Sequence, residues 1–231
     1  VAGRNFLAHS KALKRQAAKK ETKMKNLLNL AKLAAVKAGD EIMKFYAHKG
    51  FDDEILAAHS TLPESARNQN CRDFEVNLKT DHSPVTSADL AANATIFETL
   101  KSSQIQICSE EKILGESART FWLIDPLDGT KDFIAGSGEF CVCIALIEHG
   151  RPILATISIP ISGDIYSSNG GGVYKNGVLL ARPTSAPQIF MQGHYSRSAK
   201  YVQFAQKFGM QLMCKGSAIK FCILAEGGAS A

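Results

Sequence analysis

The stretch Trp122-Leu-Ile-Asp-Pro-Leu-Asp-Gly-Thr-Lys-Asp-Phe133 carries the strongest signal for the fold of this chain. Its apolar first residues predict a strand, and that strand ends abruptly in two carboxylates, a glycine and a threonine. Asp125 and Asp128 can converge on a cation there, while the backbone around Gly129 and Thr130 can face an oxyanion. A divalent cation beside a phosphate-sized anion site is typical of metal-assisted phosphoryl chemistry.

The two aspartates stand three positions apart, with Pro126 between them stiffening the turn. Neighbouring carboxylates repel each other unless a cation sits between them, and hard oxygen donors favour Mg²⁺ or Mn²⁺. An ordinary Asp-Pro/Asp-Gly turn is the competing explanation, and the motif alone does not decide between the two. Haloacid-dehalogenase-type phosphatases instead use an Asp-x-Asp pair and phosphorylate the first aspartate. The spacing here argues against that class and for water as the nucleophile.

The positive charge of the chain is concentrated at one end. The formal net charge is +5, but residues 1–23 carry seven Lys or Arg and a single Glu, so the remainder is close to neutral. We expect residues 1–23 to be a basic, disordered extension, with salt-dependent nucleic-acid binding as the alternative for that segment. An α+β metal-binding domain is expected over residues 24–185 and a partial C-terminal α/β domain over residues 186–231. No nucleic-acid partner is expected for the domains.

The cysteines and the apolar runs indicate the cellular compartment of the protein. None of the six cysteines forms a Cys-x-x-Cys pair or a zinc-like spacing, and Cys141 and Cys143 alternate with apolar residues, which predicts core positions. No apolar run reaches the length of a membrane span, and the N-terminal segment has no secretory h-region. We expect a cytoplasmic protein without a transmembrane segment. Peripheral association at the inner membrane and the oligomeric state are left open.

Periodicity predicts a mixed α+β fold. A long amphipathic helix is expected over residues 24–47, and a second helix should run from a cap at Thr86 or Ser87 to about Lys101, with Asp89 in its first turn. The other expected strands cover residues 105–108, 140–147, 152–159, 164–168, 172–175 and 211–214, and the other expected helices cover residues 196–208 and 216–226.

Three acidic motifs in a fixed order resemble one family. They are the segment Lys79–Asp89, the strand end Ser109-Glu110-Glu111 and the central stretch; each has an ordinary explanation singly. Together they resemble the inositol monophosphatase-like phosphatases, which are Mg²⁺-dependent and lithium-sensitive. The resemblance covers roughly residues 24–228. It is closest to the bacterial 3′(2′),5′-bisphosphate nucleotidases of the CysQ type, through Lys131 and the string KFCILAEG at residues 220–227.

The resemblance implies a layered αβαβα sandwich and a role for each motif residue. Glu110, Asp125 and the Leu127 carbonyl resemble ligands of a first metal, and Asp125 and Asp128 resemble ligands of a second. Asp89 and the Thr130 hydroxyl resemble the pair that orients and deprotonates the attacking water, with Glu110 assisting. The implied substrate-binding residues are Glu110, Leu127, Asp128, Gly129, Thr130, Ser217 and Lys220. A solvated helix residue is the competing explanation for Lys220.

The implied reaction is hydrolysis of 3′-phosphoadenosine 5′-phosphate to AMP and phosphate. Two or three Mg²⁺ ions per site are expected, with Mn²⁺ as a substitute and Li⁺ as an inhibitor. In the family the chain continues past Ala-Glu-Gly to a Trp-Asp motif whose aspartate completes the second metal site, whereas this sequence stops at Ala231. We therefore expect an incomplete second α/β unit. The alternatives are an inositol or sugar-phosphate monophosphatase, and an inactive remnant that binds metal or nucleotide.

Overall fold

The fold is described for most of the chain. A computed structural model describes residues 2–46, 76–78, 84–109, 118–181, 184–185, 187–196 and 198–231. Glu110 and residues 79–83 of the segment Lys79–Asp89 lie outside these residues.

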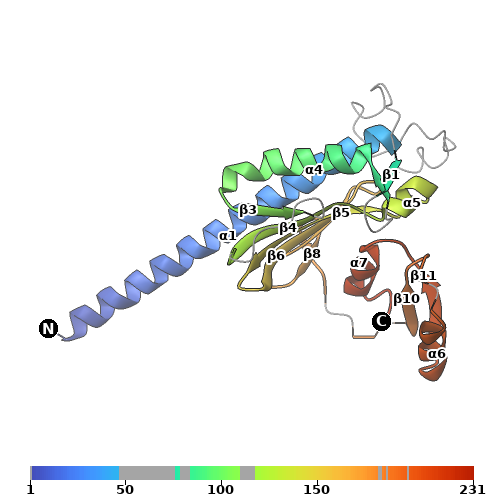
Figure 1. The fold of residues 1–231 in the computed structure, drawn as a ribbon. Helices are drawn as coiled ribbons and strands as arrows, with labels where there is room; N and C mark the ends of the chain where they lie inside the picture. The colour runs from blue at the N-terminus through green and yellow to red at the C-terminus, as the bar shows by residue number, and fades with distance from the viewer. Residues whose placement is uncertain are drawn as a thin grey trace.

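Two helices lie side by side on one face of the main sheet (Figure 1). They are α1 (Ala2–Tyr46) and α4 (Ser87–Leu100). The buried side of α1 is rich in alanine, with Ala31, Ala34, Ala35 and Ala38 fully buried. Small side chains at helical spacing let the backbone of a neighbouring helix approach closely, and they explain the tight pairing with α4.

Helix α1 begins at Ala2 rather than near Met24, so the structure differs from the disordered extension expected for residues 1–23. The side chains of residues 13–23 are exposed, as the sequence suggested, but their backbone continues the helix. The segment is rich in Ala and Lys, which are strong helix formers. Extending a helix that packing has already nucleated costs far less than starting one, and this explains the longer helix.

The main sheet has seven strands in the order β3-β4-β5-β6-β7-β8-β9. The β3 and β4 strands pair in parallel, and every later pair is antiparallel. The meander expected from the sequence is confirmed within a residue or two. The bounds are β3 (Gln106–Ser109), β4 (Thr120–Asp128), β5 (Cys141–Glu148), β6 (Arg151–Ile159), β7 (Asp164–Ser168), β8 (Val173–Lys175) and β9 (Val178–Leu179).

The rest of the described chain adds short elements on the other side of the main sheet and at its end. Helix α7 packs against the face opposite α1 and α4, and α6 packs against β10, where the rings of Phe190 and Phe204 lie 5.2 Å apart. Read from α1 outward, Figure 1 shows the layers in the order αβαβα, which confirms the expected fold. The bounds are η2 (Lys101–Ser103), α5 (Thr130–Ala135), β10 (Ile189–Gln192), α6 (Ala199–Lys207), β11 (Gln211–Cys214) and α7 (Ile219–Glu226).

Four strands, β1 (Val76–Leu78), β2 (Pro84–Thr86), β9 and β10, were not predicted from the sequence because each has only two to four residues. Strand β10 pairs in parallel with β11, and β1 pairs antiparallel with β2. Runs this short show too little alternation to be recognised. The division of the chain at residue 185 stays a prediction.

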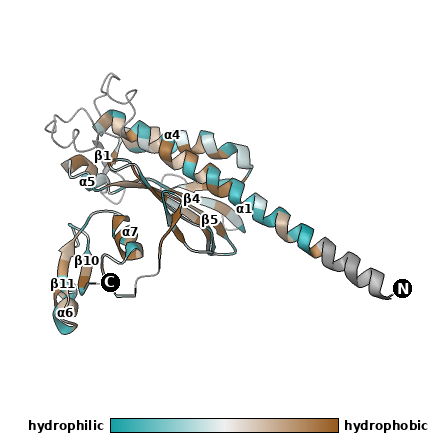
Figure 2. Cartoon of the chain, turned by 180° about the vertical axis from the view of Figure 1, so that it is seen from behind, coloured by the Kyte–Doolittle hydropathy of each residue, from teal (hydrophilic) through white to brown (hydrophobic). Residues whose placement is uncertain are grey.

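The principal hydrophobic core lies between the helix pair and the sheet. Buried side chains of α1 and α4 meet Trp122, Ile124 and Leu146 of the strands there. Figure 2 shows hydrophilic residues along the outer sides of both helices and hydrophobic strands beneath them. Among the described residues, no helix combines the length and the apolarity that crossing a membrane requires.

Candidate active site

A bulge at the end of β4 places Asp125 and Asp128 on the same face of the sheet. In a regular strand, residues three apart point to opposite faces. Here Asp125 lies opposite Cys143 and Asp128 lies opposite Cys141, so three steps along β4 match two steps along β5. The extra residue is a β-bulge, which shifts the alternation by one and re-aims the side chains that follow it. The sequence predicted that the two carboxylates converge on a cation, which stays a prediction, and it did not predict the bulge.

Short contacts fix the turn that follows the bulge. The Leu127 amide donates to Asp125 Oδ1 at 3.2 Å, and the Thr130 hydroxyl lies 3.0 Å from the Leu127 carbonyl oxygen. Gly129 has φ +95°, and a Cβ there would lie 2.8 Å from the Glu139 carbonyl oxygen. Glycine is required at this position both for its left-handed backbone and for the close approach of another segment.

Asp89 and Thr130 meet across 41 residues of sequence, as predicted. Asp89 Oδ1 lies 3.2 Å from the Thr130 hydroxyl oxygen, while Oδ2 accepts from the Thr86 amide at 2.8 Å and the Thr86 hydroxyl at 2.6 Å. The Thr86 side chain accepts from the Asp89 amide at the start of α4, and the Asp89 side chain accepts from the Thr86 amide. These two bonds form a capping box. This box fixes the rotamer of Asp89 and leaves Oδ1 for Thr130.

Burial raises the pKa of Asp89 above its usual range, although hydrogen bonds from Thr86 and Thr130 act in the opposite direction. The side chain is only 6% exposed. The Thr130 hydroxyl has one proton, so it donates either to Asp89 or to the Leu127 carbonyl at any moment. A buried carboxylate with a raised pKa, bonded to a hydroxyl that can change its acceptor, is suited to taking up a proton.

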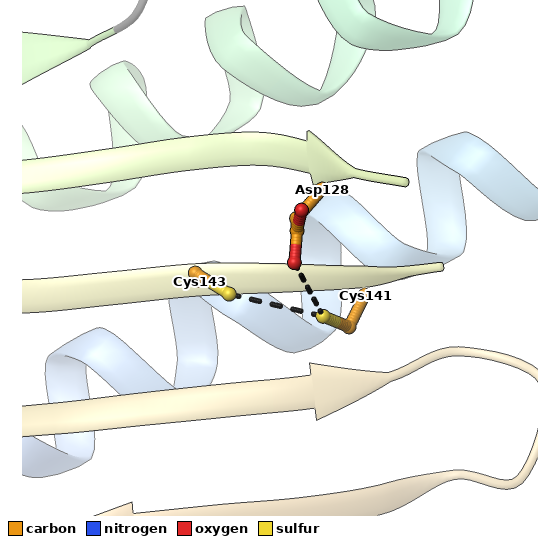
Figure 3. Close-up of side chains that lie close together, drawn as sticks. All are labelled: Asp128, Cys141 and Cys143. Carbon is orange, nitrogen blue, oxygen red and sulfur yellow. Dashed lines mark hydrogen bonds between the residues drawn. The ribbon is translucent and has the colours of Figure 1, made fainter. Parts of the chain in front are cut away.

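Asp128 is held by groups from β5 and from the start of α7. Its Oδ2 accepts from the Ala218 amide and from the Cys141 thiol, whose sulfur lies 3.6 Å away. Cys141 Sγ in turn lies 3.8 Å from Cys143 Sγ, so the carboxylate and the two thiols form one cluster (Figure 3). The sequence placed these cysteines in the core, and Cys141 is fully buried. It gave no sign that they touch Asp128.

The structure brings Ser217 to this corner and turns Lys220 back onto its own loop. Ser217 Oγ lies 3.7 Å from Cys141 Sγ, and its backbone has φ +50°. The Lys220 ammonium donates to the backbone carbonyls of Lys215 and Ser217 and is half-buried. The loop carbonyls hold the ammonium group of Lys220, so the solvated position does not describe it, and its contact with a substrate stays a prediction.

Sequence reasoning missed a polar cluster around Glu139. Its carboxylate accepts from Lys215 at 2.8 Å, from the Gly216 amide and from His194 Nε2 at 2.6 Å. Burial raises the pKa of Glu139, but these hydrogen bonds outweigh burial and lower it. The three donors are at least 55 residues away in the sequence, so no local pattern could have shown the cluster.

A pocket of about 530 Å³ opens beside this cluster. Its walls come from α5 and from the loop after β10, and its lining residues are Asp132, Ala135, Ser137, His194, Tyr195 and Cys214. The Lys131 ammonium lies 5.6 Å from the centre of the Tyr195 ring, within the range of a cation–π contact. The pocket therefore adjoins the turn that carries Gly129 and Thr130.

Asp125, Asp128 and the Leu127 carbonyl offer the hard oxygen donors that Mg²⁺ prefers. Glu110, the remaining predicted ligand, lies outside the described residues. Within the described part of the chain, side chains form two groups compact enough for a metal ion: Asp128 with Cys141 and Cys143, and Asp132 with Glu139 and His194. Neither group contains Asp125, so the described residues supply part of the predicted hard-metal site.

Comparisons with known proteins agree on one family. The model of the inositol monophosphatase family matches residues 23–231. Two relatives named 3′(2′),5′-bisphosphate nucleotidase CysQ, from Shigella flexneri and Escherichia coli strain K12, are 39% and 38% identical. In both cases the match covers 68% of this chain and 68% of the relative.

Solved structures have the same fold. CysQ from Bacteroides thetaiotaomicron, described as a bacterial member of the inositol monophosphatase family, has a TM-score of 0.66 at 27% identity over 89% of this chain and 78% of its own. The extragenic suppressor protein suhB from Bartonella henselae has a TM-score of 0.67 at 23% identity over 88% and 75% of the two chains.

Proposed function

Because the chain belongs to the inositol monophosphatase family, we propose that it is a metal-dependent phosphomonoesterase that hydrolyses 3′-phosphoadenosine 5′-phosphate to AMP and phosphate. The observation that carries this proposal is the contact of 3.2 Å between Thr130 Oγ1 and Asp89 Oδ1, beside the paired aspartates of the β4 bulge. The names of the relatives at 38–39% identity support the choice of substrate.

The cofactor we propose is Mg²⁺, with Mn²⁺ able to replace it. Asp125, the Leu127 carbonyl and Asp128 would hold it, together with Glu110. Bound Mg²⁺ supplies positive charge for the phosphate oxygens and lowers the pKa of water. The hard oxygen donors at the end of β4 fit such an ion.

The chain's own residues position the water and take its proton. Asp89 Oδ1 orients the Thr130 hydroxyl, so that Thr130 Oγ1 can accept the proton of the attacking water while its own proton passes to Asp89. The capping box holds Asp89 in place for this transfer. Positioned proton transfer of this kind typically contributes about 10²–10⁴-fold to a rate.

The turn at Gly129 and the start of α7 would contact the substrate. The amides of Gly129 and Thr130 would hold the phosphate that is cleaved, and Ser217 contacts Cys141, which in turn contacts Asp128. Tyr195 lines the adjoining pocket and Lys131 lies over its ring, so a planar base and a second phosphate could lie there. Lys220 would exchange a loop carbonyl for a phosphate oxygen on binding.

We also propose that the protein works in the cytoplasm. The five cysteines that the structure describes are all free, which fits a reducing compartment.

The proposal is tested by measuring phosphate release from 3′-phosphoadenosine 5′-phosphate with Mg²⁺. We expect Asp89→Asn to lower kcat by about 10²–10⁴-fold because the carboxamide cannot take up the proton. The matched control is Asp40→Asn, an exposed aspartate on α1, which should retain activity. Full activity of Asp89→Asn would refute the assigned role.

A second arm of the same assay compares kcat/KM on the nucleotide with kcat/KM on inositol monophosphate. A higher value on the inositol phosphate would replace the substrate proposed here. Calorimetric binding of the nucleotide without phosphate release would show a binding protein instead of an enzyme.

A further inference from the structure

The cluster of Asp128, Cys141 and Cys143 differs in chemistry from the site proposed for Mg²⁺. Its ligand atoms, one carboxylate oxygen and two sulfurs, all lie within 4.8 Å of one another. Figure 3 shows the two thiols, from alternate residues of β5, on the same side of the strand as the end of the Asp128 side chain. Sulfur ligands are soft and select zinc or cadmium, whereas Mg²⁺ avoids them.

The spacing of these atoms matches a tetrahedral zinc centre. With Zn–S bonds of about 2.3 Å and Zn–O bonds of about 2.1 Å, tetrahedral geometry places two sulfurs ~3.8 Å apart and a sulfur and an oxygen ~3.6 Å apart. The observed separations are 3.8 Å between the two Sγ atoms and 3.6 Å between Cys141 Sγ and Asp128 Oδ2. Two of the three distances between the ligand atoms therefore already equal those of a tetrahedral zinc centre.

The β4 bulge and the strand alternation together hold this arrangement. Cys141 and Cys143 are two residues apart on β5, so their side chains share a face, and the bulge brings Asp128 onto that face opposite Cys141. A disulfide would need the sulfurs to approach to about 2.05 Å, far closer than the 3.8 Å observed. An ion that bridges the sulfurs requires no such movement.

We propose that Asp128, Cys141 and Cys143 form a binding site for a thiophilic divalent cation, Zn²⁺ or Cd²⁺, with the neighbouring Ser217 hydroxyl or water as fourth ligand. Each thiol loses its proton to solvent as its metal–sulfur bond forms. Occupation of this site uses the Asp128 carboxylate, which the proposed function assigns to Mg²⁺. Zinc therefore inhibits the phosphatase because it occupies the Asp128 carboxylate, which Mg²⁺ needs as a ligand.

The binding test does not depend on the proposed function. The full 231-residue chain, reduced and in excess Mg²⁺, is titrated with Zn²⁺ by calorimetry and with Cd²⁺ by ultraviolet absorption. We expect Zn²⁺ binding that depends on the two thiols, and a thiolate-to-cadmium charge-transfer band. Cys143→Ser should weaken Zn²⁺ binding by about 10-fold or more and reduce the band, because even the loss of an outer-shell partner commonly costs 10–100-fold.

The matched control is Cys214→Ser, which removes an exposed thiol on β11 and should leave both signals unchanged. Cys141→Ser should act like Cys143→Ser. Because Cys141 is buried and its variant can fail to fold, the half-buried Cys143 keeps the test decisive. Absence of the charge-transfer band in the unmodified chain, or equal Zn²⁺ affinity in Cys143→Ser, would overturn the proposal. If Zn²⁺ binds through the thiolates and no phosphatase activity is found, only the proposed function fails.

Discussion

The two faces of the seven-stranded sheet are held in different ways. The face under α1 and α4 carries one continuous apolar core that includes fully buried Ile96 and Trp122. The face under α7 has a small cluster around Cys141, Ile159 and Cys222, and the remaining links are polar.

Several polar links attach α7 and the strands beside it to the main sheet. Asp128 accepts from the Ala218 amide, Glu139 accepts from Lys215, and Tyr166 donates to Glu226 at 2.6 Å. Two of these links end on carboxylates next to the candidate site. The apolar face thus holds α4, which carries Asp89, in place on the sheet. The polar face holds Asp128 and brings up groups whose attachment depends on charge. The two faces should respond differently to substitution and to pH.

The largest effect is expected from a cavity on the apolar face. Ile96→Ala in α4 should lower the free energy of unfolding by about 2–5 kcal/mol, because it removes buried methyl groups from a position that cannot easily collapse. Leu90→Ala, at a position 53% exposed in the same helix, is the control and should change stability by less than about 1 kcal/mol. Denaturant unfolding measures both, and equal losses would show that the helix pair is not a well-packed core.

A smaller effect on stability is expected at the turn that contains Gly129, where the two faces meet. Gly129→Ala should cost about 1–3 kcal/mol of stability, and it should also lower activity, because its Cβ would lie 2.8 Å from the Glu139 carbonyl oxygen and 3.1 Å from Ser217 Cβ. Gly163→Ala tests the backbone effect alone, since Gly163 also has a positive φ but has open space around its Cβ position. Unfolding and activity assays on both variants separate the two causes; identical behaviour would remove the role given to the close approach.

The smallest effect is expected on the polar face, and it depends on pH. Burial raises the pKa of Glu226, but hydrogen bonds from Lys175 and Tyr166 outweigh burial and lower it below 4.5. A carboxyl group whose pKa is lower in the folded chain than in the unfolded chain stabilises the fold at pH values above its unfolded pKa. This stabilisation is lost as the pH falls through its folded pKa.

Glu226→Gln should therefore reduce stability by about 1 kcal/mol at neutral pH. The difference from the unmodified chain should shrink as the pH falls below 4.5. Unfolding curves at several pH values measure it. Glu98→Gln, whose side chain is 77% exposed, should show almost no difference at any pH. A pH-independent loss in Glu226→Gln would indicate a packing effect.

Much of the site was predictable because its motifs are local. The strand that carries Asp125, the cap at Thr86 and the glycine of the turn are each specified by a few neighbouring residues, and the structure has all three, although the strand continues to Asp128. The contact between Asp89 and Thr130 was expected through the family resemblance, and the structure confirms the pairing. Their catalytic roles, and the role of Glu110, stay predictions.

The errors and omissions share a physical cause. Residues 2–23 form a helix because an adjoining packed helix already supplies the nucleus, and composition alone does not reveal that neighbour. Lys220 turns to loop carbonyls that the fold brings within reach. The Glu139 cluster and the thiols beside Asp128 join residues that are distant in sequence or whose side chains looked apolar.

The sequence by itself determined the family, the order of the main elements and the residues that can serve a metal-dependent phosphatase, because short motifs and periodic apolar patterns carry that information. Only the tertiary structure decided how those residues meet. The bulge that puts Asp125 and Asp128 on one face, the two sulfurs at coordination distance from each other and the polar attachment of α7 arise from strand register and from packing between distant segments. Register and packing are properties of the whole folded chain, so local sequence patterns do not specify them.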